Sequence, residues 1–391
     1  MSAGDRLRLV GPPGSNKVMA GELSRVVRRA LGGFRLAEPR KAGPGALVYP
    51  FDRELALVAA SYCRTASRVL WDLYESEAER LEPLYDELLE DVAGDARGWL
   101  WDGATFSIRA RNLTDFQAAA MQLVGAVKNA VIDGARARGL RVSVDVDRPD
   151  VLLALRQHDR GLTLSVDLGG QALHQRGYRR SAGLAPLREN LAAVLVMLGR
   201  FDARSEVLLD PMAGSGTIAI EAALMGRGEP LWPAGRAPAA LRLPAFAGLA
   251  GRHQPLFADT RPLAVANEID TPTVASARAN VEAAGAGEWV RTLHGDFRDL
   301  SPARVEQVLA AAGRAGQTGL ILSNPPYGER LRDDPVPLYR DLGDWCRQFR
   351  GWRAAFLVAH RDFAPAFGGR ARVVKPLRNG NQPAVFHLYD L

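Results

Sequence analysis

The chain has 391 residues, of which 47% are hydrophobic, so it is long enough for about two or three domains with cores of their own. Its 50 basic residues exceed its 44 acidic ones, and the formal charge of +6 suits a polyanionic partner without requiring one. Two cysteines, Cys63 and Cys346, are too few for a disulfide framework or a zinc site, and we expect both to be buried thiols. The start has no apolar signal segment and no run approaches the roughly 18 apolar residues of a membrane span, so the sequence predicts a soluble, cytoplasmic protein.

Up to about residue 168, strand-like runs alternate with amphipathic helices. Residues 1–70 combine short β-like runs with one helix, and residues 71–168 place strand-like runs on both sides of a long helical stretch at 115–139. This arrangement is typical of small α+β units. Apolar residues recur at helical spacing in the long stretch, so we expect Lys128 to project from an otherwise core-facing helix.

From about residue 183 the pattern changes to near-continuous apolar strands, each followed by a helix. Such runs without alternation are typical of a parallel sheet that is buried on both faces, and they predict an α/β domain. The tail at 371–391 reads as a closing hairpin around 378–383. The strands are expected at 206–210, 263–268, 289–296, 319–324 and 354–360.

A glycine turn follows the first of these strands, in the sequence DPMAGSGT. Gly214 and Gly216 allow a sharp turn and a close approach to a ligand, directly before a helix. The turn lacks the last glycine of the dinucleotide fingerprint and the Gly-Lys-Ser/Thr of a P-loop. We therefore expect it to bind a different nucleoside-containing cofactor. The cofactor-binding residues predicted here are Asp210, Ala213, Gly214, Ser215, Gly216 and Thr217.

Acidic residues end the next two strands. Glu268, with Asp270 as the second choice, is predicted to bind the ribose hydroxyls of the cofactor, and Asp296 is predicted to accept from an adenine amino group. Each residue alone is more often a helix cap or a solvated loop residue. Together they favour a ligand site, because parallel sheets bind ligands at the carboxyl ends of their strands. A positively charged cofactor such as S-adenosylmethionine suits this acidic opening.

The sequence SNPPYG, at 323–328, follows the fourth strand. An exocyclic amine on a nucleobase is a poor nucleophile, because its lone pair is delocalised into the ring. The side-chain oxygen of Asn324 and the carbonyl of Pro325 can each accept one N–H of such an amine and favour a pyramidal nitrogen. Pro326 adds rigidity, and Tyr327 offers a ring on which an extruded base can stack. We predict that these four residues are catalytic.

These motifs resemble those of the class I S-adenosylmethionine-dependent RNA methyltransferases that carry a THUMP domain. The resemblance is strongest to the large-subunit ribosomal RNA guanine-N2 methyltransferases, and the tRNA guanine-N2 enzymes are relatives. It rests on DPMAGSGT at 210–217, NPPYGERL at 324–331, the junction at 164–193 and the helical stretch at 115–139. It implies an N-terminal ferredoxin-like domain at 1–70, a THUMP RNA-binding domain at 71–168 and a Rossmann-like methyltransferase domain at 169–391.

The resemblance also implies the reaction and further site residues. The expected reaction transfers a methyl group to the exocyclic N2 of a guanine in structured RNA, most of all 23S rRNA. Pro186, in APLREN, is expected near the methionine end of the cofactor. The closing Asn-Gly motif is expected near the target base, although Asn-Gly also favours a plain hairpin turn. One departure is Glu268, where relatives often have an aspartate. The predicted substrate-binding residues are Lys128, Arg179, Arg378, Asn379 and Gly380.

Several alternatives stay open at this point. The target could be a tRNA guanine, or an adenine N6 in DNA or RNA, since similar Pro-Pro-Tyr motifs serve that amine. A non-catalytic RNA-binding assembly factor is a third class of protein. The insertion at 226–258 suits either a rim that grips RNA or a packed loop that covers a sheet edge. Metal catalysis is not expected, because the six histidines form no ligand cluster, and neither cysteine lies near the motifs to support covalent C5 methylation.

Overall fold

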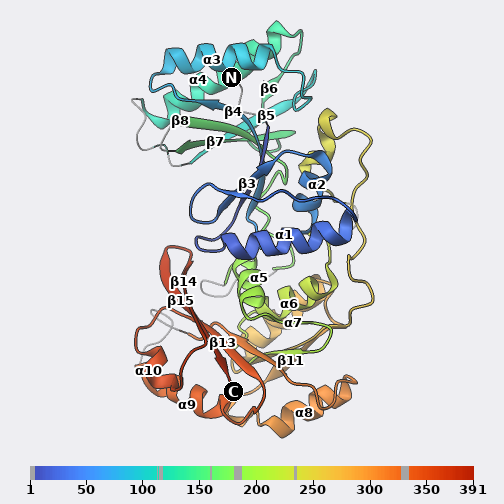
Figure 1. Ribbon diagram of the computed structural model, residues 1–391, viewed down its shortest axis with the longest axis vertical. Coiled ribbons are helices and arrows are strands. Elements are labelled where there is room, and N and C mark those ends of the chain that lie inside the picture. The colour runs from blue at the N-terminus through green and yellow to red at the C-terminus, as the bar shows by residue number, and fades with distance from the viewer. Residues whose placement is uncertain are drawn as a thin grey trace. The chain divides into compact units, whose positions relative to one another are not determined.

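The described residues form two separate sheets, and each belongs to one of two compact units (Figure 1). The computed structural model describes residues 5–111, 113, 118–158, 161–179, 187–232, 236–326 and 334–391. The N-terminal unit comprises Met1–Gly11, Glu22–Leu173 and Pro230–His253, and the C-terminal unit comprises Pro12–Gly21, His174–Glu229 and Gln254–Leu391.

Within the described residues, the sheet of the N-terminal unit has the strand order β2-β3-β1-β4-β8-β7-β5-β6. Its strands are β1 (Arg6–Val10), β2 (Arg40–Lys41), β3 (Ala46–Pro50), β4 (Arg68–Ser76), β5 (Thr105–Arg111), β6 (Ser143–Val144), β7 (Val151–His158) and β8 (Gly161–Asp167). Strand β4 pairs with β1 on one side and with β8 on the other. The domain boundary predicted near residue 70 therefore falls inside a strand of one continuous sheet.

Helices accompany this N-terminal sheet. They are α1 (Asn16–Ala30), whose first residues belong to the C-terminal unit, α2 (Arg53–Tyr62), α3 (Leu81–Ala93) and α4 (Ala120–Ala137), with the short 3₁₀ turns η1 (Ala239–Arg242) and η2 (Pro244–Phe246). Helices α3 and α4 lie side by side (Figure 1). Gly134 makes this possible, because a Cβ there would lie 2.7 Å from the Cβ of Val92. Helix α4 confirms the predicted long helix, and Lys128 is half-buried on it.

Residues 230–253 of the insertion belong to the N-terminal unit. The indole nitrogen of Trp232 donates to the carbonyl of Ala60 at 2.9 Å, on the helix α2. Phe246 meets the rings of Phe51 and Trp71 edge-on, with centroid separations of 6.2 and 6.3 Å. The described part of the insertion is therefore a packed segment, which agrees with the second of the two alternatives, a packed loop. Its contacts include α2, through Ala60, and the inner strand β4, through Trp71.

The sheet of the C-terminal unit has the order β11-β10-β9-β12-β13-β15-β14 among the described residues. Its strands are β9 (Val207–Asp210), β10 (Leu263–Glu268), β11 (Val290–His294), β12 (Gly319–Ser323), β13 (Arg353–Val358), β14 (Val373–Asn379) and β15 (Gln382–Asp390). Strands β9 to β13 run parallel, and β15 is antiparallel to β13 and to β14. The predicted parallel strands and the closing hairpin are confirmed, and the α/β, Rossmann-like fold class with them.

Helices cover both faces of this C-terminal sheet (Figure 1). They are α5 (Glu189–Leu198), α6 (Thr217–Arg227), α7 (Thr271–Ala283), α8 (Pro302–Ala311), α9 (Val336–Cys346) and α10 (Phe363–Phe367), with the 3₁₀ turn η3 (Phe297–Asp299). On β9, Leu208 packs into the layer with α5 and α6, whereas Leu209 packs into the layer with α8 and α9. Two buried faces explain why the strands read as continuous apolar runs.

Both cysteines are buried, as predicted, and burial raises the pKa of each thiol well above its ordinary value. Among the described helices, we find none with the length and apolar character that a membrane crossing requires.

Candidate active site

The strand order of the C-terminal sheet reverses between β9 and β12. Strands β10 and β11 lie on one side of β9, and β12 and β13 lie on the other. Helix α6, which follows β9, and helix α9, which follows β12, pack into opposite layers. Open parallel sheets bind their ligands outside the strand carboxyl ends at such a switch point. The strand ends found here are Asp210, Glu268 and Ser323, so two of the predicted cofactor-binding residues lie at the switch point.

The glycine loop between β9 and α6 leaves space beside its backbone. Gly214 and Gly216 adopt φ values of +55° and +81°, in the left-handed region that favours glycine. A Cβ at Gly214 would meet no atom within 4 Å, so the loop is open there. Helix α6 begins at Thr217, and its first N–H groups and partial positive charge favour a polar or anionic ligand group at this end.

Two buried asparagines, which the sequence analysis missed, hold this loop. Asn267, on β10, donates from Nδ2 to the carbonyls of Pro211 at 3.1 Å and Gly295 at 3.0 Å. Asn280, on α7, donates to the carbonyl of Ser215 at 3.1 Å. A polar residue inside the apolar run LAVANE was the available signal for Asn267, because a buried amide needs hydrogen-bond partners.

Glu268 reaches the glycine loop. Its Oε2 accepts from the backbone N–H of Gly214 at 2.8 Å. Its Oε1 accepts from the N–H groups of Ile269 at 2.9 Å and Asp270 at 3.0 Å. The carboxylate is therefore oriented by neutral donors at the mouth of the switch point, where the sequence predicted a ribose-binding acid.

Asp270 and Asp296 have local partners. Asp270 caps α7 by accepting from the N–H and hydroxyl of Thr273, which lowers the pKa of this exposed carboxyl. Asp296 caps η3 and forms an ion pair with Arg298 at 2.9 Å. Capping was the ordinary interpretation of both residues, and their contact with a cofactor stays a prediction.

Asp210 lies beneath the glycine loop, with only 1% of its surface exposed. Its Oδ1 accepts from the hydroxyl of Ser323 at 2.6 Å and from the N–H of Met212 at 3.3 Å. The pKa of this carboxyl is raised to about 7, chiefly by burial and also by the nearby Glu268 charge, while the two hydrogen bonds limit the rise. The contacts of Asp210 therefore join the start of the glycine loop to Ser323 on β12.

Asn324 follows β12 at the same edge. Within the described part of the chain, its Oδ1 is buried and has no hydrogen-bond partner. Leaving a buried acceptor unsatisfied costs about 1–3 kcal/mol, so this atom suits a donor on a ligand. Pro325 is buried and Pro326 half-buried, and the Tyr339 hydroxyl lies 3.5 Å from the carbonyl of Pro326. Tyr327 and Pro186, both predicted site residues, lie outside the described residues.

The predicted substrate-binding residues belong to three different segments of the chain. Arg179 pairs with Glu189 at 3.2 Å and donates to Thr217 at 3.3 Å, so its described contacts join the starts of α5 and α6. Lys128 belongs to the N-terminal unit.

Arg378, Asn379 and Gly380 lie in the hairpin of β14 and β15. Gly380 adopts φ +62° and forms the two-residue turn with Asn381, so Asn379 is the last strand residue. Arg378 donates to the carbonyl of Asn381 at 2.7 Å. No group of three or more His, Cys, Asp or Glu side chains in the described ranges is arranged to hold a metal ion.

Sheet order, glycine loop and acidic strand ends together define a Rossmann-like domain of the methyltransferase type. Residues 176–387 match the family UPF0020, described as an RMKL-like methyltransferase domain. The chain belongs to this family.

Among curated relatives, the "Ribosomal RNA large subunit methyltransferase K/L" of Syntrophotalea carbinolica is 34% identical over 415 residues, covering 97% of this chain and 53% of that protein. The chain therefore spans about half the length of the curated relatives it matches.

Solved structures share the fold across the chain. SMU.472, assigned as a methyltransferase and solved in complex with SAH, is 21% identical with a TM-score of 0.79, covering 99% of this chain and 98% of that one. TrmN from Thermus thermophilus is 22% identical with a TM-score of 0.69, covering 99% of this chain and 100% of that one. At these identities, the likeness concerns the fold.

Proposed function

We propose that this chain transfers a methyl group from S-adenosylmethionine to the exocyclic N2 of a guanine in structured RNA, with 23S rRNA as the substrate. The observation that carries the proposal is the Oδ1 of Asn324 at the switch point of the C-terminal sheet, which is buried and has no partner among the described residues. A rigid acceptor at this position is suited to an N–H donor that arrives with a substrate.

The residues at the switch point fit an adenosyl cofactor. Glu268 offers carboxylate acceptors for ribose hydroxyls, and the glycine loop offers open space and N–H groups at the start of α6. The relative SMU.472 was solved with SAH, the product of such a cofactor. When bound, S-adenosylmethionine supplies an electrophilic methyl group.

The protein's own contribution is the orientation of a weak nucleophile. Asn324 Oδ1 and the carbonyl of Pro325 would accept the two N–H groups of the amine, which directs the nitrogen lone pair and favours a pyramidal nitrogen. Preorganised acceptors of this kind act on the transition state more than on the ground state. Pro325 is buried, so its carbonyl has little freedom to move.

RNA is the proposed partner for two reasons. The matched relatives are named ribosomal RNA large subunit methyltransferases. The chain carries a formal charge of +6. We further propose that the N-terminal unit contains the THUMP domain and contributes to RNA binding. A cytoplasmic location belongs to the same proposal.

The test incubates the purified chain with S-adenosylmethionine and unmodified transcripts of 23S rRNA segments or tRNA, followed by mass spectrometry of the nucleosides. The expected product is N2-methylguanosine in 23S rRNA. If N2-methylguanosine appeared in tRNA alone, the substrate would be tRNA rather than 23S rRNA. If N6-methyladenosine appeared instead, the target amine would be adenine N6 rather than guanine N2. Absence of any methylated nucleoside from a folded chain that binds S-adenosylhomocysteine would contradict the proposed function.

A further inference from the structure

Among the described residues, the side chain of Ser323 connects the end of β12, just before Asn324, with the end of β9 and the start of the glycine loop. Ser323 is the last residue of β12 and the neighbour of Asn324 in sequence. Its hydroxyl lies 2.6 Å from Asp210 Oδ1 and 3.4 Å from the carbonyl of Met212. A hydroxyl donates one hydrogen, and the shorter distance and the carboxylate acceptor favour Asp210.

Both partners are sealed from solvent, since Ser323 is 0% and Asp210 1% exposed. Asp210 also accepts from the N–H of Met212, the second residue of the loop that leads to Gly214. One carboxylate therefore touches the start of the glycine loop and the residue that precedes Asn324. Backbone pairing of β9 with β12 does not make this connection. The paired residues run from Gly319↔Val207 to Ile321↔Leu209 and stop before Asp210 and Ser323.

We propose that Ser323 is a positioning residue, which sets Asn324 relative to the glycine loop through its hydrogen bond to Asp210. The inference deepens the proposed function and rests on it, because the placement matters only if the two segments hold reacting groups. In this account Asp210 acts through Ser323 and the loop rather than as a direct cofactor ligand.

The strength of this link depends on pH. Burial raises the pKa of Asp210 to about 7, and the Ser323 hydrogen bond opposes that rise because it favours the ionised form. The charged neighbour that acts on Asp210 is Glu268, on β10, whereas β12 and the loop contribute the neutral donors Ser323 and Met212. Removing the hydroxyl should therefore move the titration of Asp210 to higher pH.

The test compares Ser323→Ala with the wild-type protein in single-turnover methyl transfer and in calorimetric binding of S-adenosylhomocysteine. The expected rate falls roughly 10- to 100-fold, the scale of a lost hydrogen bond to a charged group. The cofactor dissociation constant should stay within about threefold, because the contacts of the glycine loop with Glu268 and Asn280 remain. Ser323→Thr keeps the donor and should recover most of the rate, and Ser323→Cys controls for volume with a weak donor.

A second readout needs neither RNA nor turnover. The melting temperature is followed across about pH 5.5 to 8.5, with Asp210→Asn as the reference that lacks the titrating group. The stability difference between the wild-type protein and this reference should fall with rising pH and level off near pH 7, where Asp210 becomes ionised in the folded state. With Ser323→Ala in place of the wild-type protein, the levelling-off should move to higher pH.

The outcomes separate the two proposals. A wild-type protein that methylates no RNA contradicts the proposed function, while the melting profiles still decide whether the link acts on Asp210. If the wild-type protein is active, a Ser323→Ala variant with the wild-type rate and an unshifted profile overturns the inference alone. Equal losses of rate and cofactor affinity with an unshifted profile would also overturn it, since a general disturbance of packing predicts that pattern.

Discussion

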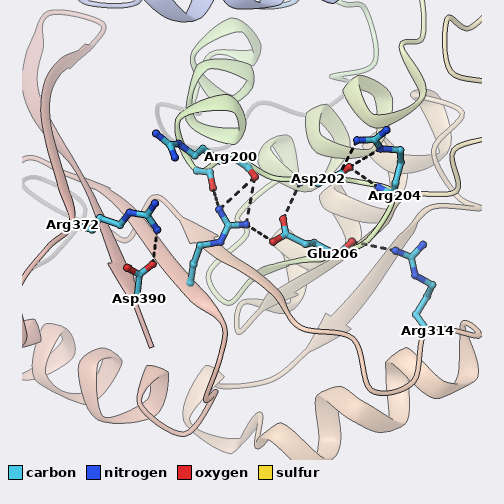
Figure 2. A network of polar contacts seen from close by, with 9 residues as sticks. Arg200, Asp202, Arg204, Glu206, Arg314, Arg372 and Asp390 are labelled. Carbon is cyan, nitrogen blue, oxygen red and sulfur yellow. Dashed lines mark hydrogen bonds and ion pairs between the residues drawn. The ribbon is translucent and has the colours of Figure 1, made fainter.

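In the C-terminal sheet, charged residues have different partners at the amino ends of the parallel strands, here called the amino edge, and at their carboxyl ends, here called the carboxyl edge. At the amino edge, Arg353 of β13 forms an ion pair with Glu206 at 2.5 Å and donates to the carbonyl of Gly199. Figure 2 shows the same network reaching Asp202 and Arg314, which bond to the side chain and the backbone of Glu206. Opposite charges are matched there, and the network joins segments that are far apart in sequence.

At the carboxyl edge, Asp210 and Glu268 are held by a hydroxyl and by backbone N–H groups rather than by a described cation. Asn324 Oδ1 has no described partner at all. Asp296 is the exception, because Arg298 pairs with it. Matched charges suit the amino edge to stability, whereas acceptors held by neutral donors leave the carboxyl edge with a negative potential that would suit the proposed cofactor.

The largest expected effect is at the carboxyl edge. Asn324→Ala should lower kcat by roughly 10²–10³, the scale for deleting a preorganised polar group. Cofactor affinity should stay near the wild-type value, because Glu268 and the glycine loop keep their contacts. Single-turnover methyl transfer and a melting curve on the same samples check this. Full activity in a folded variant would mean that Asn324 merely ends a strand.

At the amino edge, Glu206→Ala should act on stability. It removes the acceptor of Arg353 and of the Asp202 N–H, and both groups are partly buried. The free energy of unfolding should fall by about 1–3 kcal/mol. Denaturant unfolding measures the change. Arg204→Ala, which breaks an exposed pair with Asp202, is the matched control and should cost less than about 1 kcal/mol.

A smaller effect is expected from pH. Because the folded-state pKa of Asp210 is raised to about 7, its contribution to stability is present below the ordinary carboxyl pKa and is lost as the pH rises through about 7. Asp210→Asn removes this titration, so stability should decline less with rising pH over that window. Melting curves of both proteins in matched buffers measure this. If Asp210→Asn kept the pH dependence of the wild-type protein, the proposed effect of burial on Asp210 would be wrong.

Local patterns in the sequence predicted much of the C-terminal unit. Continuous apolar runs indicated β9 to β13, and the residues Gly214 and Gly216 indicated the turn, because these signals depend on neighbours in sequence. The role of Asp210 could not be predicted in this way, since its partner Ser323 lies 113 positions away. Asp270 had two interpretations from the start, and only the contact with Thr273 favoured the cap.

The N-terminal unit was less predictable. The strand β4 pairs with strands from both halves of the unit, so a boundary drawn from changes of pattern falls inside the sheet. Trp232 bonds to Ala60, 172 positions away, and no local signal distinguishes such a packed segment from an exposed rim. Pairings at this separation are decided by tertiary packing rather than by local propensity.

The most direct test of the account compares two acidic residues at opposite edges of one sheet. Calorimetric binding of S-adenosylhomocysteine would be measured for Glu268→Ala and Glu206→Ala, with melting curves to show that both fold. We predict that Glu268→Ala weakens binding by roughly 10- to 100-fold, the scale of a lost charged hydrogen bond. Glu206→Ala should stay within about threefold of the wild-type affinity. Equal affinities in the two folded variants, or a larger loss for Glu206→Ala, would contradict the assignment of the carboxyl edge as the cofactor site.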